Sequence, residues 1–214
     1  MGNDIGRFKG PLGSSGYWEL PNRGYEWETG ISLGPYRTGV SHVITSLGSQ
    51  IRDFKYWSLP ENELLSLADG LTNLVLQALW ERFASPPFSF LLAVPPNHHG
   101  KPSLPRHICK SISDRYPDRF TDMSSSVVRA RELDSVKGVH KGSRARYLKG
   151  AWEIDTRKFT RPPKGSGVLI VDDVYDTGAT MREMSRTLRR VFSRDVNQYM
   201  LAVSHVETRD WNQL

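Results

Sequence analysis

Residues 168–180 read Val168-Leu-Ile-Val-Asp-Asp-Val-Tyr-Asp-Thr-Gly-Ala-Thr180. Four apolar residues in a row are typical of a strand covered on both faces of a parallel sheet. Two adjacent carboxylates, Asp172 and Asp173, follow directly, and a tight turn then leads into a helical pattern over 177–192. In open α/β sheets, ligands bind beyond the carboxyl ends of the strands. This stretch therefore predicts an α/β fold and the place of a binding site.

The turn of residues 176–180, here called the glycine turn, is suited to an anion. Gly178 and the small Ala179 let the backbone come close to a ligand, and Thr177 and Thr180 add hydroxyl donors. Amides at the start of a helix lack intrahelical partners, and the helix dipole favours a negative charge there. A phosphate fits this turn best.

The carboxylates of Asp172 and Asp173, here called the acid pair, would repel a phosphate placed directly beside them. We expect them to lie a short distance away and to accept hydrogen bonds from vicinal hydroxyls, as a ribose offers. The sequence contains neither GxxxxGK[ST] nor GxGxxG, so it lacks both of these nucleotide-binding motifs. Acid pair and turn together indicate a sugar phosphate; a nucleotidyl or phosphoryl site fits less well, and a ligand-free turn is the structural alternative.

Apolar spacing elsewhere predicts strands alternating with helices, hence a mostly parallel sheet flanked by helices. Residues 1–35, rich in Gly, Pro and aromatics, are predicted to form an irregular arm, and residues 36–214 the main domain. Further helices are predicted from Val40 through Ile51, after a capping box at Ser58–Glu61 with Leu64 to Leu79 on the helix, and after Ser103. Strands are predicted at 88–94, at 124–128, where the strand is short, and at 197–206.

Length and composition set further limits. The 214 residues, 38% hydrophobic and 24% charged, describe a globular protein with a sizeable core. Apolar runs stay below the roughly 20 residues needed to cross a bilayer, and no secretory signal is recognisable. Cys109 is the single cysteine, which excludes an internal disulfide and a cysteine-based zinc site. We expect a cytoplasmic protein without a membrane partner.

The net charge of +6 is concentrated in one region. Residues 129–164, here called the basic segment, hold eleven Lys and Arg against four Asp and Glu. Little periodicity and several glycines predict that much of it is a mobile loop. An excess of positive charge before the candidate site indicates an anionic ligand, and a solvated surface is the alternative.

The stretch VLIVDDVYDTGAT closely resembles the 5-phosphoribosyl-1-pyrophosphate (PRPP) motif of type I phosphoribosyltransferases. The resemblance implies their Rossmann-like fold, binding of the ribose hydroxyls by Asp172 and Asp173, and binding of the 5′-phosphate by Asp176, Thr177, Gly178, Ala179 and Thr180. It implies a pyrophosphate loop after the first core strand, at Pro95, Pro96, Asn97, His98, Gly100 and Lys101. It also implies Mg²⁺, held mainly through PRPP and water with the acid pair as its only candidate protein ligands, and a homodimer.

Within that family the sequence is most similar to competence-protein-F (ComF-like) members. The likeness rests on Tyr36-Arg-Thr-Gly39, Arg129-Ala-Arg131, Arg144 and Lys149-Gly-Ala-Trp152. The cysteine-rich zinc ribbon of that group has no counterpart here, and Leu133 to Lys137 replaces a Thr-x-x-Gln pattern of its loop.

Two functions follow from the resemblance. The first is an enzyme of nucleotide metabolism that transfers phosphoribose from PRPP to a nucleobase-like nitrogen and releases pyrophosphate, with Lys137, Lys141 and Arg144 closing over the pyrophosphate. The second is a non-catalytic protein that senses PRPP or nucleotides, or handles nucleic acid through the basic segment in DNA uptake or defence. The acceptor is unidentified; a base can stack on Trp211, although a tryptophan near a chain end usually packs.

Overall fold

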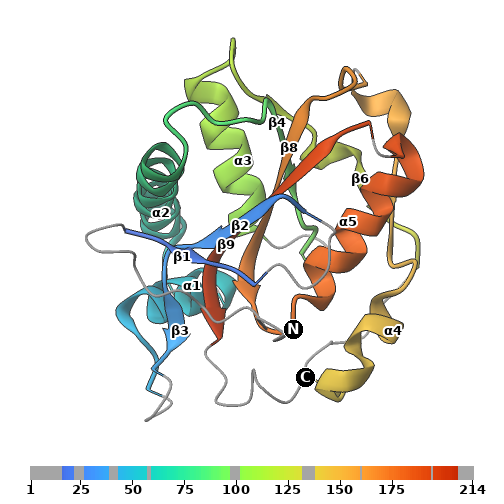
Figure 1. Cartoon of the computed structure of the whole chain (residues 1–214). Helices are drawn as coiled ribbons and strands as arrows, with labels where there is room; N and C mark the ends of the chain where they lie inside the picture. The colour runs from blue at the N-terminus through green and yellow to red at the C-terminus, as the bar shows by residue number, and fades with distance from the viewer. Residues whose placement is uncertain are drawn as a thin grey trace, which may run out of the picture.

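The computed structural model describes residues 16–21, 27–38, 43–56, 59–96, 102–131, 138–159, 161–193 and 195–206. Their core is a seven-stranded sheet with the order β1-β2-β9-β8-β4-β5, in which β3 also lies along β9 (Figure 1). Every pairing is parallel except that of β1 with β2. The strands are β1 (Trp18–Glu19), β2 (Thr29–Ser32), β3 (Pro35–Arg37), β4 (Phe90–Ala93), β5 (Thr121–Asp122), β8 (Gly167–Tyr175) and β9 (Asn197–Val206).

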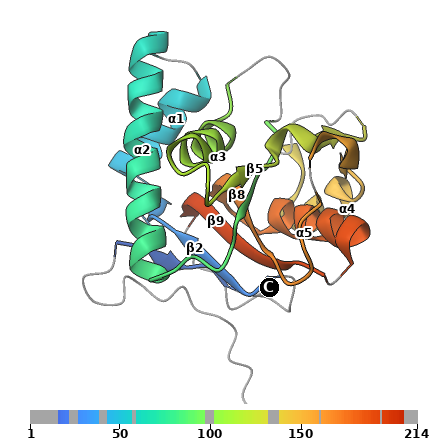
Figure 2. The same ribbon diagram turned by 90° about the horizontal axis from the view of Figure 1, so that it is seen from above.

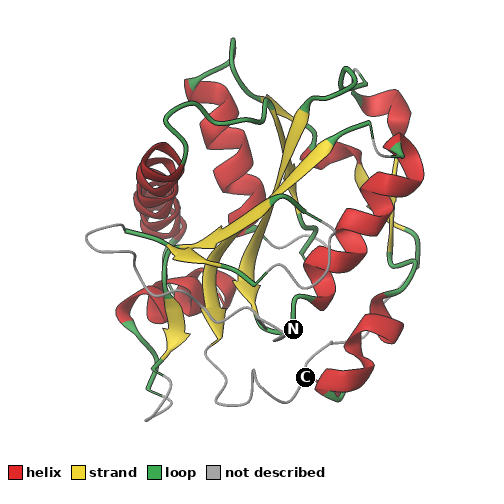
Figure 3. Cartoon of the chain, in the orientation of Figure 1, coloured by secondary structure: helices red, strands yellow, loops and turns green. Residues whose placement is uncertain are grey.

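Helices cover both faces of this sheet (Figures 2 and 3). On one face lie α1 (Ser46–Tyr56), α2 (Glu61–Arg82) and α3 (Leu104–Arg115), and on the other lie α5 (Ala179–Phe192) and the short α4 (Arg144–Leu148). A two-stranded ribbon of β6 (Val127–Arg129) and β7 (Trp152–Ile154) packs beside α5. The predicted fold class, a mostly parallel sheet flanked by helices, is confirmed.

The central strand β8 explains why this arrangement has two cores. Successive residues of a strand point to opposite faces. Leu169 and Val171 join the core under α1, α2 and α3, whereas Val168 and Ile170 join the core under α5. All four side chains are at most 1% exposed. An uninterrupted apolar run is therefore what a strand between two helix layers requires.

The N-terminal segment differs from its prediction. Residues 1–35 were expected to be an irregular arm, yet β2 pairs in parallel with β9 from Thr29 opposite Tyr199 to Ser32 opposite Ala202. The side chain of Ile31 is 1% exposed in the first core. The strand was missed because Gly30 and Ser32 interrupt its apolar pattern, and only the neighbouring strand supplies its hydrogen-bond partners.

The first two helices also begin differently than predicted. The helix expected from Val40 begins at Ser46 as α1, because Thr45 accepts a hydrogen bond from the Gly48 amide at 2.9 Å, while Ile44 pairs with Arg37 in an isolated bridge. The second helix begins at Glu61 after Pro60, without a side-chain cap; Ser58 of the predicted capping box lies outside the described residues. Ser103 does cap α3, as predicted, by accepting from the Arg106 amide.

The basic segment is more ordered than predicted. Its described residues include α4, β6 at its start, and β7, whose Trp152 is 2% exposed beneath α5. The buried carboxylate of Glu183 on α5 accepts a hydrogen bond from the Gly150 amide at 2.8 Å and pairs with Arg190. Glu183 on α5 therefore helps to hold the basic segment against the body. No sequence pattern indicated this contact.

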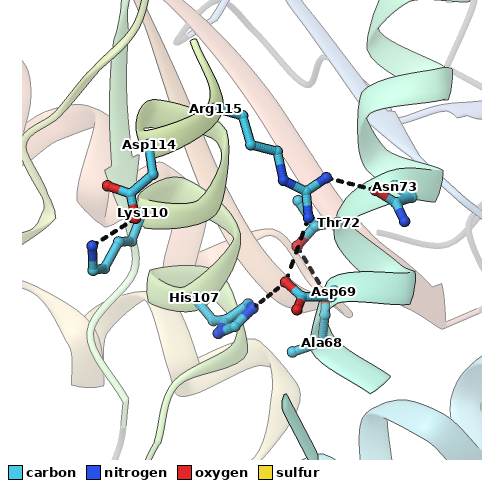
Figure 4. Close-up of polar contacts among 8 residues, drawn as sticks. All are labelled: Ala68, Asp69, Thr72, Asn73, His107, Lys110, Asp114 and Arg115. Carbon is cyan, nitrogen blue, oxygen red and sulfur yellow. Dashed lines mark hydrogen bonds and ion pairs between the residues drawn. The ribbon is translucent and has the colours of Figure 1, made fainter. Parts of the chain in front are cut away.

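Polar contacts join α2 and α3 at the surface (Figure 4). Asp69 on α2 lies 3.0 Å from His107 Nε2 and 3.5 Å from Arg115 on α3, and Arg115 also donates to Asn73 at 2.6 Å. Exposed contacts of this kind each contribute little to stability. No helix among the described residues has both the length and the apolar character required to span a membrane.

Replacement of two helix glycines by alanine is expected to change the stability of the protein in opposite directions. A Cβ on Gly48 would meet the Tyr36 carbonyl oxygen at 2.1 Å, whereas a Cβ on Gly70 would meet nothing within 4 Å. We expect Gly48→Ala to destabilise the protein by about 1–3 kcal/mol, because α1 would have to move off β3. We expect the matched control Gly70→Ala to stabilise it by about 0.5–1 kcal/mol. Urea unfolding measures both; equal effects of the two changes would contradict this packing of α1.

Candidate functional site

The acid pair lies at the carboxyl end of β8. The strand was predicted to end at Val171 but continues to Tyr175, so both aspartates belong to it, and Asp172 pairs with Ala202 of β9. Asp172 is buried at 7% exposure, and the side chain of Asp173 is 23% exposed. The Asp173 amide donates to Asp172 Oδ1 at 2.8 Å. One carboxylate is thus inside the protein, and the other faces the solvent side of the same edge.

The glycine turn follows and starts α5. Gly178 has φ of 71°, which glycine adopts without strain, and a Cβ there would lie 2.7 Å from the Tyr175 hydroxyl. The Ala179 amide donates to Thr177 Oγ1 at 3.4 Å, and the first helical bond joins the Arg182 amide to the Gly178 carbonyl at 2.9 Å. The first turn of α5 contains no acidic residue, so its positive end is not neutralised locally.

Asp176, the first residue of the glycine turn, is bound by the basic segment. Arg144 forms an ion pair and hydrogen bond with its Oδ2, and Lys141 Nζ lies 3.4 Å from its Oδ1. Lys141 and Arg144, which were expected to close over a pyrophosphate, both lie at this carboxylate. Lys137, the third predicted cation, lies outside the described residues.

A lysine missed by the sequence analysis completes the arrangement. Lys55 Nζ, in the last turn of α1, donates to Asp173 Oδ2 at 2.7 Å. The helix predicted from the apolar spacing ended at Ile51, so Lys55 fell beyond it. No local pattern relates a residue to another 118 positions away. Only the packing of α1 over the edge of the sheet reveals this contact.

The charges around the acid pair affect its protonation. Burial, and next the neighbouring charge of Asp173, raise the pKa of Asp172 well above its usual range, whereas Lys55 and the Asp173 amide act in the opposite direction. Burial alone would lower the pKa of Lys55, but the attraction and hydrogen bond of Asp173 raise it above the ordinary value. The lysine therefore stays charged, and the buried aspartate holds its proton more firmly than an ordinary carboxyl.

These groups surround one cleft of about 680 Å³. The acid pair, all five residues of the glycine turn and Arg144 line it, as do Pro95 and Pro96 from the predicted pyrophosphate loop. Asn97, His98, Gly100 and Lys101 of that loop lie outside the described residues. The opposite wall is formed by β3, α1 and the end of β9, with Tyr36, Arg37, Arg52, Phe54, Lys55, Tyr56 and Val206.

The basic segment is attached to the predicted pyrophosphate loop as well as to the glycine turn. In the structure Arg129 donates to the Pro96 carbonyl and Arg131 to the Tyr147 carbonyl. Both contacts fix the backbone around the cleft.

The residues at the cleft offer few protein ligands to a divalent cation. Among the described residues, no group of three or more His, Cys, Asp or Glu side chains is placed to hold a metal ion. The acid pair offers two hard oxygen donors, which suits Mg²⁺ that keeps water and ligand phosphates as its other partners. A cation held mainly through a bound phosphate compound therefore fits this site.

The shifted pKa of Asp172 predicts how stability changes with pH. The folded protein holds this proton more tightly than the unfolded chain, whose carboxyl pKa is 3.8, so the associated stability is present at low pH and is lost as pH rises toward about 8. In EDTA we expect Asp172→Asn to melt at a higher temperature than wild type at pH 8, with a difference that shrinks toward pH 5.

Asp155→Asn is the control, because arginine pairing lowers the pKa of Asp155 to about 2, below the range scanned. Its difference from wild type should not vary between pH 5 and pH 8. A pH-independent difference for Asp172→Asn as well would show that this carboxyl is not protonated by burial.

Comparison with known proteins finds similarity to one family over part of the chain. Residues 111–212 match the family model of the phosphoribosyl transferase domain. No curated protein sequence matches the chain. A crystal structure of adenine phosphoribosyltransferase is similar at 15% sequence identity with a TM-score of 0.41, over 67% of this chain and 79% of that one. The part of the chain from the end of α3 through β9, including the acid pair and the glycine turn, is thus similar to phosphoribosyl transferase domains.

Proposed function

We propose that the cleft binds PRPP with Mg²⁺ and that the protein is a phosphoribosyltransferase. The observation that supports this most is the succession of a buried and a half-buried carboxylate at the end of β8, followed by a glycine turn at the start of a helix, all lining one cleft. The match of residues 111–212 to the phosphoribosyl transferase domain supports the same assignment.

In this proposal each part of the ligand has its own partners. The acid pair accepts hydrogen bonds from the two ribose hydroxyls, and the amides and hydroxyls of the glycine turn hold the 5′-phosphate. The pyrophosphate lies toward Pro95 and Pro96, which line the same cleft. Mg²⁺, held mainly through PRPP and water with the acid pair as its candidate protein ligands, would offset charge on the leaving group.

The acceptor side is the wall formed by β3 and α1. Among its residues, Tyr36 and Tyr56 carry aromatic side chains that are not buried in the core, and flat nucleobases stack on such rings. Trp211, the candidate named from the sequence, lies outside the described residues. We propose a nucleobase-like acceptor bound against this wall.

The reaction is a substitution at the anomeric carbon of the ribose. A nitrogen of the acceptor forms the new bond as the bond to the pyrophosphate oxygen breaks, and the pyrophosphate leaves with the bonding electron pair. The protein contributes by holding both reactants in line and by surrounding the departing charge with positive groups. The competence-protein-F group remains our preferred likeness within the family, on the residues named above.

Several described Lys and Arg residues of the basic segment are engaged in internal contacts, which disfavours the alternative of a nucleic-acid surface. Arg144 and Lys141 bind Asp176, Arg129 and Arg131 bind backbone carbonyls, and Arg157 pairs with Asp155. A polyanion would have to compete with these internal contacts. We therefore propose no second function.

Calorimetry with PRPP and Mg²⁺ tests the proposal. We expect wild type to bind and Asp172→Asn/Asp173→Asn to bind at least about 100-fold more weakly, because amides replace both carboxyl groups that accept hydrogen bonds from the ribose hydroxyls. Asp114→Asn is the matched control, since this aspartate is exposed on α3 and pairs with Lys110.

Pyrophosphate release is then screened against a panel of bases with the wild-type protein. Folded wild type that fails to bind PRPP in the presence of Mg²⁺ would refute the proposed ligand. Binding without pyrophosphate release for any base would leave a PRPP-binding protein and refute the enzyme.

A further inference from the structure

Lys55 reaches the acid pair from the opposite wall of the cleft. It lies in the last turn of α1, where a helix terminus favours positive charge. Its Nζ is 2.7 Å from Asp173 Oδ2, and no other cation of the described residues forms an ion pair with either aspartate. The side chains of Lys55 and Asp173 remain 39% and 23% exposed, so the pair faces the cleft and is not sealed in the core.

The electrostatics of the acid pair call for such a cation. Two adjacent carboxylates repel one another, and burying one of them costs free energy unless opposite charge or hydrogen bonds compensate. The Asp173 amide satisfies one oxygen of Asp172, and Lys55 neutralises Asp173. The charges that a divalent cation would balance are therefore already partly balanced by the chain itself.

Lys55 also has hydrogen-bond donors left for a ligand. An ammonium group carries three hydrogen-bond donors, and Asp173 Oδ2 takes one of them. Lys55 lines the same cleft as the acid pair and the glycine turn. A ligand oxygen bound at the acid pair lies within reach of this nitrogen, so one lysine can bridge protein and ligand.

We propose that Lys55 is a ligand-binding residue and the resident counter-ion of the acid pair, occupying the position where a divalent cation would otherwise neutralise Asp173. This inference rests on the proposed function as far as the ligand is a ribose phosphate; the counter-ion role is independent of it. Two consequences follow. A ribose phosphate without pyrophosphate binds without divalent cations, and removal of Lys55 opens a metal site at the acid pair.

The first experiment is calorimetry with ribose 5-phosphate in EDTA and in millimolar Mg²⁺. In EDTA we expect Lys55→Met to bind about tenfold or more weakly than wild type, and Lys55→Arg to bind within a few-fold of it, because arginine keeps the charge. Mg²⁺ should restore most of the loss in Lys55→Met. Lys110→Met, which removes a lysine that is 71% exposed on α3, is the control. Thermal unfolding verifies that each variant is folded.

The second experiment needs no sugar. Free Mn²⁺ is titrated into each protein and followed by electron paramagnetic resonance. We expect Lys55→Met to bind one Mn²⁺ about tenfold more tightly than wild type, and we expect Asp173→Asn in the same protein to abolish that gain.

The outcomes separate the two proposals. Wild type that binds neither PRPP nor ribose 5-phosphate refutes the proposed function, while the Mn²⁺ titration still decides the counter-ion role. If Lys55→Met loses sugar affinity equally with and without Mg²⁺ and gains no Mn²⁺ affinity, Lys55 only tethers α1 and the inference is overturned. If Lys55→Met binds sugar and Mn²⁺ as wild type does, the inference is likewise overturned.

Discussion

The burial of the Asp172 carboxylate beside a second carboxylate is the constraint on which the site depends. The packing of the sheet does not require a carboxylate at this position, because the four apolar residues before it already fill the cores under both helix layers. Burial and the neighbouring carboxylate raise the pKa of Asp172, whereas the Asp173 amide and Lys55 act in the opposite direction. In the proposed function, this arrangement holds two acceptors ready for the ribose hydroxyls at some expense of stability.

A second set of contacts fixes the remaining wall of the cleft. Asp176 binds Arg144 and Lys141, Arg129 binds the Pro96 carbonyl, and Glu183 binds the Gly150 amide. The basic segment is thereby attached to the glycine turn, to the start of the predicted pyrophosphate loop and to α5. Its positive charge serves first to hold the cleft together, and a ligand phosphate would meet cations that are already positioned.

The two sides of the cleft come from different parts of the fold. The acid pair lies near the carboxyl end of β8, a strand inside the sheet with a buried apolar run, and the glycine turn follows this strand. The facing wall comes from β3 and α1, at the edge of the body. In the proposed phosphoribosyl transfer, such a division would give the sugar phosphate a fixed geometry, whereas the acceptor wall could vary without disturbing the core.

The sequence by itself determined the class of fold and pointed to the acid pair and the glycine turn as the centre of the candidate site. The apolar run at 168–171, the glycine turn and the spacing of α3, α5 and β9 are local signals, and local signals follow from strand and helix periodicity. Tertiary structure decided what no local pattern contains. The start of α1 depends on the hydroxyl of Thr45 and on close contact with β3; β2 is a strand because β9 lies beside it; and the basic segment folds because Glu183 and the core beneath α5 hold it. Lys55 joins the site only because α1 packs over the carboxyl end of β8, a contact between residues 118 positions apart that composition and spacing cannot encode.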